Sequence, residues 1–314
     1  MRTLRTIAEL RGVLEGPRAR AQAAREGAGA SSKRRTVGLV PTMGAFHDGH
    51  LSLMRRARAE CDLVVVSVFV NPTQFNDPSD LETYPRDERR DAALAEAAGI
   101  DFLFAPSIRE LYPEGFATRV AVSGLGEMLE GAHRGPGHFA GVATVVVKLL
   151  NIVSPDLAYF GQKDAQQTVL IKRVVRDLDI PVRIRVCPTV RAPDGLALSS
   201  RNHRLSPGER VRAGALYRSL KAAEQAIAAR ERDPAAVAAI ARHELALDAI
   251  EPDYFELVDP ETFAPAERLR KDVLAVVAAS IGTTRLIDNH LIHVPAAPRQ
   301  ANPDPATALA PLPS

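Results

Sequence analysis

The segment Pro41 to His50, PTMGAFHDGH, has residue types and a spacing that could bind a phosphate chain. It follows a short apolar run, and His47 and His50 stand three positions apart at the start of an expected helix. The first turn of a helix favours an anion because its N–H groups are unpaired and its dipole is positive there. Gly44 and Gly49 would let a nucleotide approach the backbone. Two surface histidines or a zinc pair are the alternatives, although no third metal ligand stands nearby.

The segment Phe69 to Phe75, FVNPTQF, ends a second apolar run and offers the amides of Asn71 and Gln74. Ligands of open α/β sheets bind beyond the carboxyl ends of the strands, where these amides would lie. A neutral amide can orient a substrate carboxylate without neutralising it, which leaves the carboxylate nucleophilic. A plain turn at Asn71-Pro72 is the alternative.

The segment Phe160 to Gln167, FGQKDAQQ, again joins a strand end, a glycine and a helix start. Lys163 could neutralise phosphate charge, and Gln167 lies one turn further on. Asp164 could bond a ribose hydroxyl or, alternatively, only cap the helix.

The loop Arg191 to Asn202, RAPDGLALSSRN, offers two hydroxyls and a forked donor, Ser199, Ser200 and Arg201, which suit phosphate. Such a loop could close over a nucleotide as a lid, or it could be an exposed turn.

Two weaker signals complete the set. His138 precedes an expected helix in RGPGHFAG (134–141), and Asp87 and Asp91 share one face of a helix in YPRDERRD (84–91). The aspartates could assist Mg²⁺, which prefers one or two carboxylates plus substrate phosphates, or they could simply face solvent.

Strands and helices that alternate predict an α/β fold with a parallel, Rossmann-like sheet that positions these segments. Expected strands are 37–42, 63–70, 100–105, 118–122, 157–160 and 182–186, and expected helices are 49–60, 86–98, 140–153 and 164–177. Residues 1–10 read as a short amphipathic helix.

The pattern changes past residue 190, where helices at 207–232 and 234–247 precede strands at 254–258, 273–280 and 285–292. This order indicates a smaller α+β domain. We expect a first domain over 1–189, a second domain over 190–293 and a disordered tail over 294–314. Residues 15–35 are basic and rich in small residues, which indicates a flexible insertion.

The amino-acid composition and charge of the chain count against several classes of protein. The 314 residues are 46% hydrophobic and 25% charged, as in a globular protein, and the formal charge of +2 gives no case for a nucleic-acid binder. Cys61 and Cys187 lack metal or redox spacing and suit a reducing cytosol. Because no apolar run reaches the ~20 residues that span a bilayer and no signal peptide is evident, we expect a cytoplasmic protein without a membrane partner.

Six segments occur in the order and spacing of one known family, namely PTMGAFHDGH, FVNPTQF, YPR, GHFAGV, FGQKDAQQ and DGLALSSRN. Over about residues 36–290 the chain resembles the pantothenate synthetase (pantoate–β-alanine ligase) family, which is related to class I aminoacyl-tRNA synthetases. His47 to His50 resembles their HIGH signature, and Ser199 to Arg201 stands where their KMSKS lid would be. The resemblance implies that residues 1–189 form a Rossmann-like domain that binds ATP and pantoate, and that residues 190–293 form a smaller lid domain. It also implies a homodimer.

The resemblance also implies a reaction and its site. ATP and (R)-pantoate would give pantoyl adenylate and diphosphate, and β-alanine would then displace AMP to form pantothenate. His50 would be a proton donor that acts with His47 and Lys163, Asp91 would belong to a Mg²⁺ site, and Gln74, Gln167, Asn71 and His138 would bind substrate. The residues at the ATP site would be Met43, Gly44, Ala45, Phe46, His47, Asp48, Gly49, His50, Gly161, Gln162, Lys163, Asp164, Val190, Leu198, Ser199, Ser200 and Arg201.

The chain departs from the family pattern at a few positions. The stretch from Arg134 to His138 is one residue longer than the family's R-P-G-H, Ala140 replaces a common Arg, and Asp87 replaces the usual Thr after YPR. The nearest alternative is a nucleotidyltransferase that adenylylates a phosphopantetheine-like substrate, which would need a site for a phosphorylated acceptor. A non-catalytic, RNA-binding relative is a second alternative, and the near-neutral charge counts against it.

Overall fold

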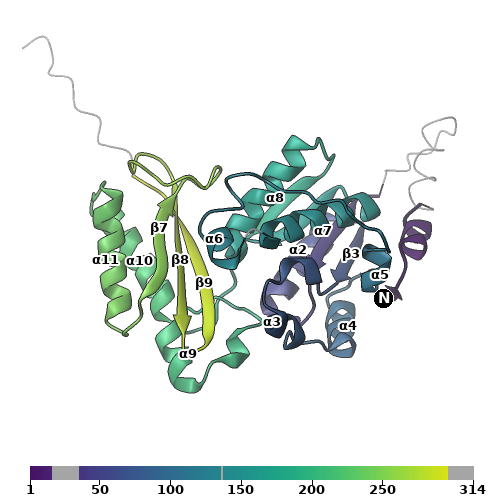
Figure 1. Cartoon of the computed structure of the whole chain (residues 1–314), viewed down its shortest axis with the longest axis horizontal. Helices are drawn as coiled ribbons and strands as arrows, with labels where there is room; N and C mark the ends of the chain where they lie inside the picture. Colours follow the sequence, from purple (N-terminus) through teal and green to yellow (C-terminus); the bar gives the residue numbers. More distant parts are fainter. Residues whose placement is uncertain (16–34, 136, 296–314) are drawn as a thin grey trace, which may run out of the picture.

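The structure, a computed structural model, describes residues 1–15, 35–135 and 137–295 (Figure 1). The first part of the chain folds around a six-stranded sheet of order β1-β4-β3-β2-β5-β6, in which every neighbouring pair is parallel. The strands are β1 (Arg2–Leu4), β2 (Val37–Thr42), β3 (Leu63–Val68), β4 (Phe102–Phe104), β5 (Leu157–Gly161) and β6 (Arg183–Cys187). This arrangement confirms the predicted α/β fold.

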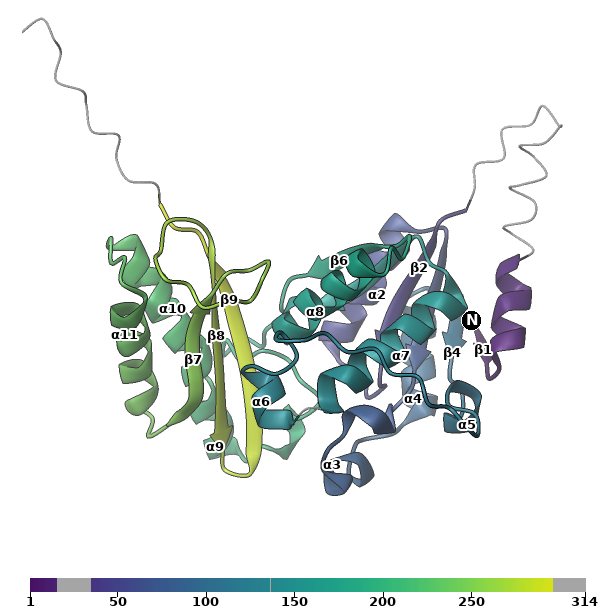
Figure 2. The ribbon, with the colours of Figure 1, turned by 45° about the horizontal axis from the view of Figure 1, so that its top comes forward.

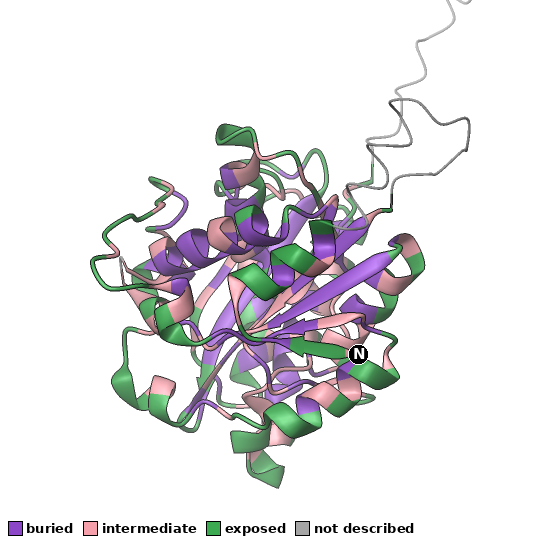
Figure 3. Cartoon of the chain, turned by 90° about the vertical axis from the view of Figure 1, so that its right-hand side faces the viewer, coloured by how far each residue is buried: buried purple, intermediate pink, exposed green. Residues whose placement is uncertain are grey.

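Helices cover both faces of this sheet. Apolar residues of α2 and α4 pack on one face in one cluster, and those of α7 and α8 pack on the other face in a second cluster. Figure 3 shows the strands buried between helices whose outer faces are exposed. The helices of this part are α2 (Asp48–Glu60), α3 (Pro78–Glu82), α4 (Glu88–Ala97), α5 (Ile108–Leu111), α6 (Glu130–Arg134), α7 (Gly137–Val153) and α8 (Ala165–Asp177), with short 3₁₀ turns η1 (Pro72–Gln74) and η2 (Gln162–Asp164).

The strand order reverses at β2, which has β3 on one side and β5 on the other. Chains leaving these strands in opposite directions create a crevice beyond their carboxyl ends, where open α/β sheets bind ligands. The two segments at this crevice are PTMGAFHDGH after β2 and FGQKDAQQ after β5. The topology therefore brings together motifs that lie more than a hundred residues apart.

The second part has an antiparallel sheet of order β7-β8-β9 with helices on its outer side (Figures 1 and 2). Its core joins α10 and α11 to one face of the sheet, while the other face, through residues such as Tyr254 and Val276, packs against the first part. Its elements are η3 (Asn202–Arg204), α9 (Pro207–Ala213), α10 (Ala215–Ala228), α11 (Pro234–Ala246), β7 (Pro252–Val258), β8 (Val273–Ile281) and β9 (Thr284–Ile292).

Three predicted elements are wrong. Residues 2–4 form a strand beside β4, and a helix spans only 7–15 of the described N-terminal residues. Residues 118–122 form no strand, because the Val120 N–H donates to the Thr144 hydroxyl of α7 instead of to a neighbouring strand. The predicted helix over 207–232 is divided at Gly214 into α9 and α10.

The predicted boundary at 190 falls in the segment between β6 and α9. Most of the predicted insertion (15–35) and tail (294–314) lies outside the described residues. No helix in the described part of the chain is both long and apolar enough to cross a bilayer.

Candidate active site

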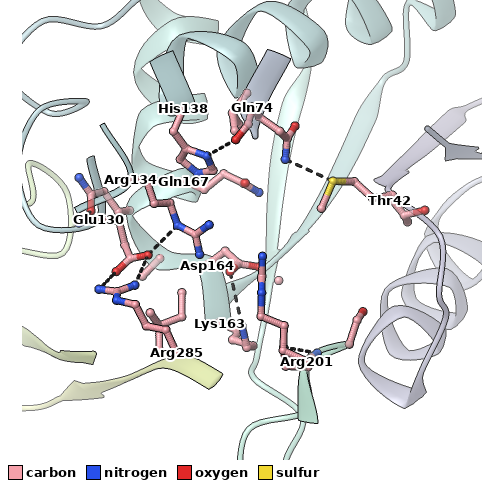
Figure 4. Close-up of a pocket in the computed structure, with 18 of the residues that line it drawn as sticks. Thr42, Gln74, Glu130, Arg134, His138, Lys163, Asp164, Gln167, Arg201 and Arg285 are labelled. Atoms are coloured by element: carbon pink, nitrogen blue, oxygen red, sulfur yellow. Dashed lines mark hydrogen bonds and ion pairs between the residues drawn. The ribbon is translucent and has the colours of Figure 1, made fainter. Parts of the chain in front are cut away.

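A cavity of about 770 Å³ opens at the carboxyl ends of the parallel strands and is bounded on its far side by β9 (Figure 4). All four predicted segments contribute to it. Among the predicted residues, those that line the cavity are Met43, His47, Gly49, His50, Asn71, Gln74, His138, Gly161, Lys163, Asp164, Gln167, Val190, Leu198, Ser199, Ser200 and Arg201.

The two histidines begin α2. His47 is the N-cap residue, its Nδ1 accepts from the Gly49 N–H at 3.1 Å, and the His50 Nδ1 accepts from the His47 N–H at 3.4 Å. A Cβ at position 49 would lie 2.8 Å from the His47 ring, so glycine is needed there. In each ring Nδ1 therefore accepts a backbone N–H at the start of α2, and Nε2 stays available to the cavity.

Burial lowers the pKa of His47 to about 4 and that of His50 to about 3, and the neighbouring His47 adds to the effect at His50. Both rings are therefore neutral near pH 7. A neutral imidazole whose Nδ1 accepts a hydrogen bond carries its proton on Nε2. The pair thus offers two N–H donors to an anion without adding charge.

The turn before α2 is held by Asp91 of α4. Its carboxylate accepts from the Ala45 N–H at 2.7 Å and from the Phe46 N–H at 2.8 Å, and a Cβ at Gly44 would lie 2.8 Å from the same carboxylate. Asp91 is buried, which raises its pKa, and it does not line the cavity. In this structure Asp91 therefore holds the turn before α2, and its assignment to a Mg²⁺ site stays a prediction.

Lys163 lies on η2 between β5 and α8, and its Nζ is 3.5 Å from the carboxylate of Asp164. The Asp164 side chain caps no helix, so the structure does not support the capping alternative. Asn289 of β9 donates to the carbonyls of Gln162 and Lys163, each at 2.9 Å. Lys163 therefore reaches the cavity from a turn that follows β5 of the first sheet and is hydrogen-bonded to β9 of the second sheet.

The predicted lid loop also lines the cavity, through residues 198–201. Arg201 donates to Asp80 of α3 at 2.9 Å, and Arg204 reaches the same carboxylate at 3.2 Å. The Ser200 hydroxyl lies 3.5 Å from the Ala45 carbonyl. In this conformation the loop is therefore linked to the segment after η1.

The amide side of the cavity is built around Gln74. Asn71 is buried, donates to the Gln74 side-chain oxygen at 2.9 Å, and accepts from the Tyr112 hydroxyl at 2.9 Å. The His138 Nδ1 donates to the Gln74 carbonyl at 2.7 Å, and burial lowers the pKa of His138 to about 4. Asn71 thus orients Gln74, while Gln74 and Gln167 face the cavity (Figure 4).

A network of ion pairs lines the cavity where the first and second parts of the chain meet. Glu130 of α6 lies 2.9 Å from Arg134 and 2.7 Å from Arg285 of β9, and it accepts from the Tyr254 hydroxyl at 2.9 Å. Burial opposes ionisation of Glu130, but the two arginines outweigh it and lower its pKa to about 2.

Some predicted residues do not line the cavity. Besides Asp91, they are Gly44, Ala45, Phe46, Asp48 and Gln162. Sequence reasoning missed the contributions of Glu130, Arg285, Asp288 and Asn289. The strand TRLIDNHLI has polar residues in runs and no period of two, so its sequence gives no signal of a polar side.

Comparisons with known proteins identify the family of the chain. The family model described as Pantoate-beta-alanine ligase matches residues 2–291. A pantothenate synthetase from Cereibacter sphaeroides is 51% identical over 91% of this chain and 98% of its own length, and one from Thermotoga neapolitana is 53% identical over 83% and 93%.

Solved structures give the same result. The pantothenate synthetase from Thermus thermophilus is 46% identical, has a TM-score of 0.82, and covers 92% of this chain and 99% of its own. A pantoate-beta-alanine ligase from Francisella tularensis, complexed with beta-gamma ATP and beta-alanine, is 35% identical with a TM-score of 0.73, over 93% and 97%. The chain therefore belongs to the pantoate–β-alanine ligase family.

Proposed function

We propose that the chain condenses (R)-pantoate with β-alanine, at the cost of ATP, through a pantoyl-adenylate intermediate. The ligase class follows from the family. The observation that supports these two steps best is the cavity itself, which is lined both by neutral amides and by cationic or N–H donors. An acid held by the amides would lie beside a nucleotide held by the donors.

In the first step a pantoate carboxylate oxygen attacks the α-phosphorus of ATP, and the bond to the diphosphate breaks. Such a displacement needs positioning and charge stabilisation more than covalent help from the protein. We assign the Nε2–H groups of His47 and His50, and the ammonium of Lys163, to the phosphate oxygens. Ser199, Ser200 and Arg201 would complete this set when the loop closes.

We assign Gln74 and Gln167 to the pantoate carboxylate and hydroxyls, with Asn71 as the residue that orients Gln74. Amides keep the carboxylate anionic and therefore nucleophilic. In the second step the neutral amine of β-alanine attacks the acyl carbon, AMP leaves, and one proton is released. Closure of the loop would protect the adenylate from water.

We infer that Mg²⁺ enters as a complex with ATP. Mg²⁺ keeps most of its coordination in substrate phosphates and water, with one or two carboxylates. No group of three or more potential metal-ligating side chains occurs among residues 1–15, 35–135 and 137–295, and the Asp91 oxygens already accept backbone N–H groups. The carboxylate on the cavity wall beside Lys163 is that of Asp164.

We further propose a cytoplasmic homodimer. The two thiols, Cys61 and Cys187, are free and buried, as fits a reducing compartment. The dimer rests on the family resemblance, and sedimentation equilibrium at micromolar concentration tests it.

The decisive measurement is diphosphate release from Mg·ATP with and without pantoate, followed by addition of β-alanine. We expect release that depends on pantoate and that β-alanine accelerates, with AMP and pantothenate as products. Release without pantoate, or a product that retains the nucleotide, would contradict the proposal.

A further inference from the structure

The second sheet reaches into the turn that carries Lys163. Asn289 lies on β9, on the far side of the cavity from β5, yet it makes three hydrogen bonds to the dipeptide Gln162-Lys163. We propose that Asn289 is a positioning residue for Lys163 and thereby sets the phosphate-binding geometry from outside the Rossmann-like part. The inference rests on the proposed function, because it takes Lys163 as a phosphate-binding residue.

The contact needs an amide. The Asn289 Nδ2 donates to the Gln162 and Lys163 carbonyls at 2.9 Å, and its Oδ1 accepts from the Gln162 Nε2 at 3.2 Å. Both amide hydrogens and the oxygen are therefore used within one dipeptide. Asp has the same shape, but it would turn a carboxylate oxygen toward two carbonyl oxygens. Since only 4% of Asn289 is exposed, water cannot readily replace the lost bonds.

The turn needs external support. The 3₁₀ turn η2 connects β5 to α8, and neither its N-cap, Gly161, nor the N-cap of α8, Asp164, makes a side-chain capping bond. Asn289 supplies the missing side-chain contact from the other part of the molecule. It fixes the backbone on both sides of the Lys163 nitrogen, and hence the point from which the lysine stem extends.

Asn289 is itself held rigidly. Asp288, which is buried, receives two hydrogen bonds from Arg191 at 2.5 and 3.0 Å and one from the Asn289 N–H at 2.7 Å. Arg191 also donates to the Asn289 carbonyl at 3.2 Å, and its guanidinium lies 4.0 Å from the centre of the Tyr217 ring. These contacts hold the backbone of Asn289 in place, so its side-chain amide can fix the position of the turn that carries Lys163.

The test is a double-mutant cycle in the full-length protein, read as pantoate-dependent diphosphate release. A misplacement of about 1 Å in a catalytic group can cost about 100-fold in rate. We expect Asn289→Ala to lower kcat/KM for ATP by about 10-fold to 100-fold, and Asn289→Asp at least as much. Because the residue acts through Lys163, Asn289→Ala should cause no further loss, within about twofold, in a Lys163→Ala background.

Leu286→Ala is the matched control. It lies on the same strand, is buried in the core of the second part, and does not line the cavity. We expect Leu286→Ala to lower the thermal stability. Its small effect on kcat/KM for ATP should be the same in the wild-type and in the Lys163→Ala background. If Asn289→Ala does not fold at the assay temperature, Asn289→Ser, which keeps one donor, replaces it and should show an intermediate loss.

The outcomes separate the two claims. If Lys163→Ala retains full activity, the assignment of Lys163 under the proposed function fails. Two results would show that the positioning role is wrong while the proposed function stands. In the first, Lys163→Ala lowers kcat/KM and Asn289→Ala lowers it further by the same factor in the Lys163→Ala background. In the second, Asn289→Ala keeps wild-type kinetics.

Discussion

His47 and His50 each combine a structural and a chemical role in one ring. The Nδ1 atoms accept backbone N–H groups at the start of α2, as the side chain of a serine or aspartate N-cap would. Serine or aspartate would offer no second N–H donor on the cavity side. Under the proposed function, the same two rings would therefore cap the helix and bind phosphate.

The depressed pKa of His50 makes a prediction about stability. Its pKa falls from an unfolded value of 6.5 to about 3, so between these values the unfolded state binds a proton that the folded state does not. The free energy of unfolding must therefore fall as the pH is lowered through this window. For one such histidine the loss at pH 5 is about 2 kcal/mol. Since glutamine does not titrate, His50→Gln should lose about 2 kcal/mol less than the parent between pH 7 and pH 5.

Urea unfolding at the two pH values measures this difference. The comparison at pH 7 gives the cost of the substitution itself, because the native ring is neutral there. Equal pH dependence in the parent and in His50→Gln would show that His50 titrates normally in the folded protein.

The sequence predicts which residue types line the cavity, but it does not predict where each side chain points. Lys163, Gln74 and Gln167 line the cavity as the motifs indicate. The spacing of Asp87 and Asp91 and the family resemblance both suggest Asp91 for a metal site, yet its carboxylate points toward the backbone of Ala45 and Phe46. Sequence spacing gives the face of a helix, whereas the partner of that face depends on tertiary packing.

At the scale of elements, α6 is joined to the second sheet by Glu130. Glu130→Ala removes the ion pair with Arg285 and the acceptor of the Tyr254 hydroxyl, while Arg285 keeps its ion pair with Asp253 at 2.6 Å. The variant should therefore lower the free energy of unfolding by about 1–3 kcal/mol, the cost of leaving a buried polar group without its partner. Glu127→Ala, at an exposed position before the same helix, is the control. Equal urea midpoints for the two variants would contradict the network's role.

The link between α3 and the lid loop predicts an effect on ATP affinity. Asp80 binds Arg201 and Arg204, so ATP must compete with its carboxylate for Arg201. Partly exposed pairs of this kind contribute about 0.2–1 kcal/mol. Asp80→Asn should therefore tighten ATP binding, up to about fivefold, in a calorimetric titration.

Glu82→Gln provides the matched control, because it removes the same charge from the exposed end of α3. Weaker ATP binding in Asp80→Asn would instead indicate that Asp80 supports the ATP-bound conformation.

Long elements with a clear period were predictable, and short ones were not. α7 was expected from apolar residues on one face despite its valines, and the structure confirms it. The short helices α3, α5 and α6 span only four or five residues, too few for a period to emerge. Residues 118–122 have the composition of a strand, but α7 supplies their hydrogen-bond partner.

At the scale of the whole molecule, the cavity belongs to both parts of the chain. Its ties across the parts join residues far apart in sequence, such as Gln162 with Asn289 and Glu130 with Arg285. Local patterns contain no information about such pairs. The sequence therefore predicts two domains, the second of them as a lid domain, but it does not predict that β9 forms a wall of the site.

The last prediction concerns the C-terminal end. The family match ends at residue 291, β9 ends at Ile292, and the Arg232 guanidinium donates to the carbonyl of Pro295. Among the residues that the structure describes, those that line the cavity lie between Pro41 and Asn289. A chain that stops after Pro295 should therefore retain the kcat and the KM for ATP and for β-alanine within about twofold, and its thermal midpoint should not change. Steady-state kinetics and calorimetry of the shortened and full-length proteins test this. A selective rise in one KM would mean that residues 296–314 contribute to the site.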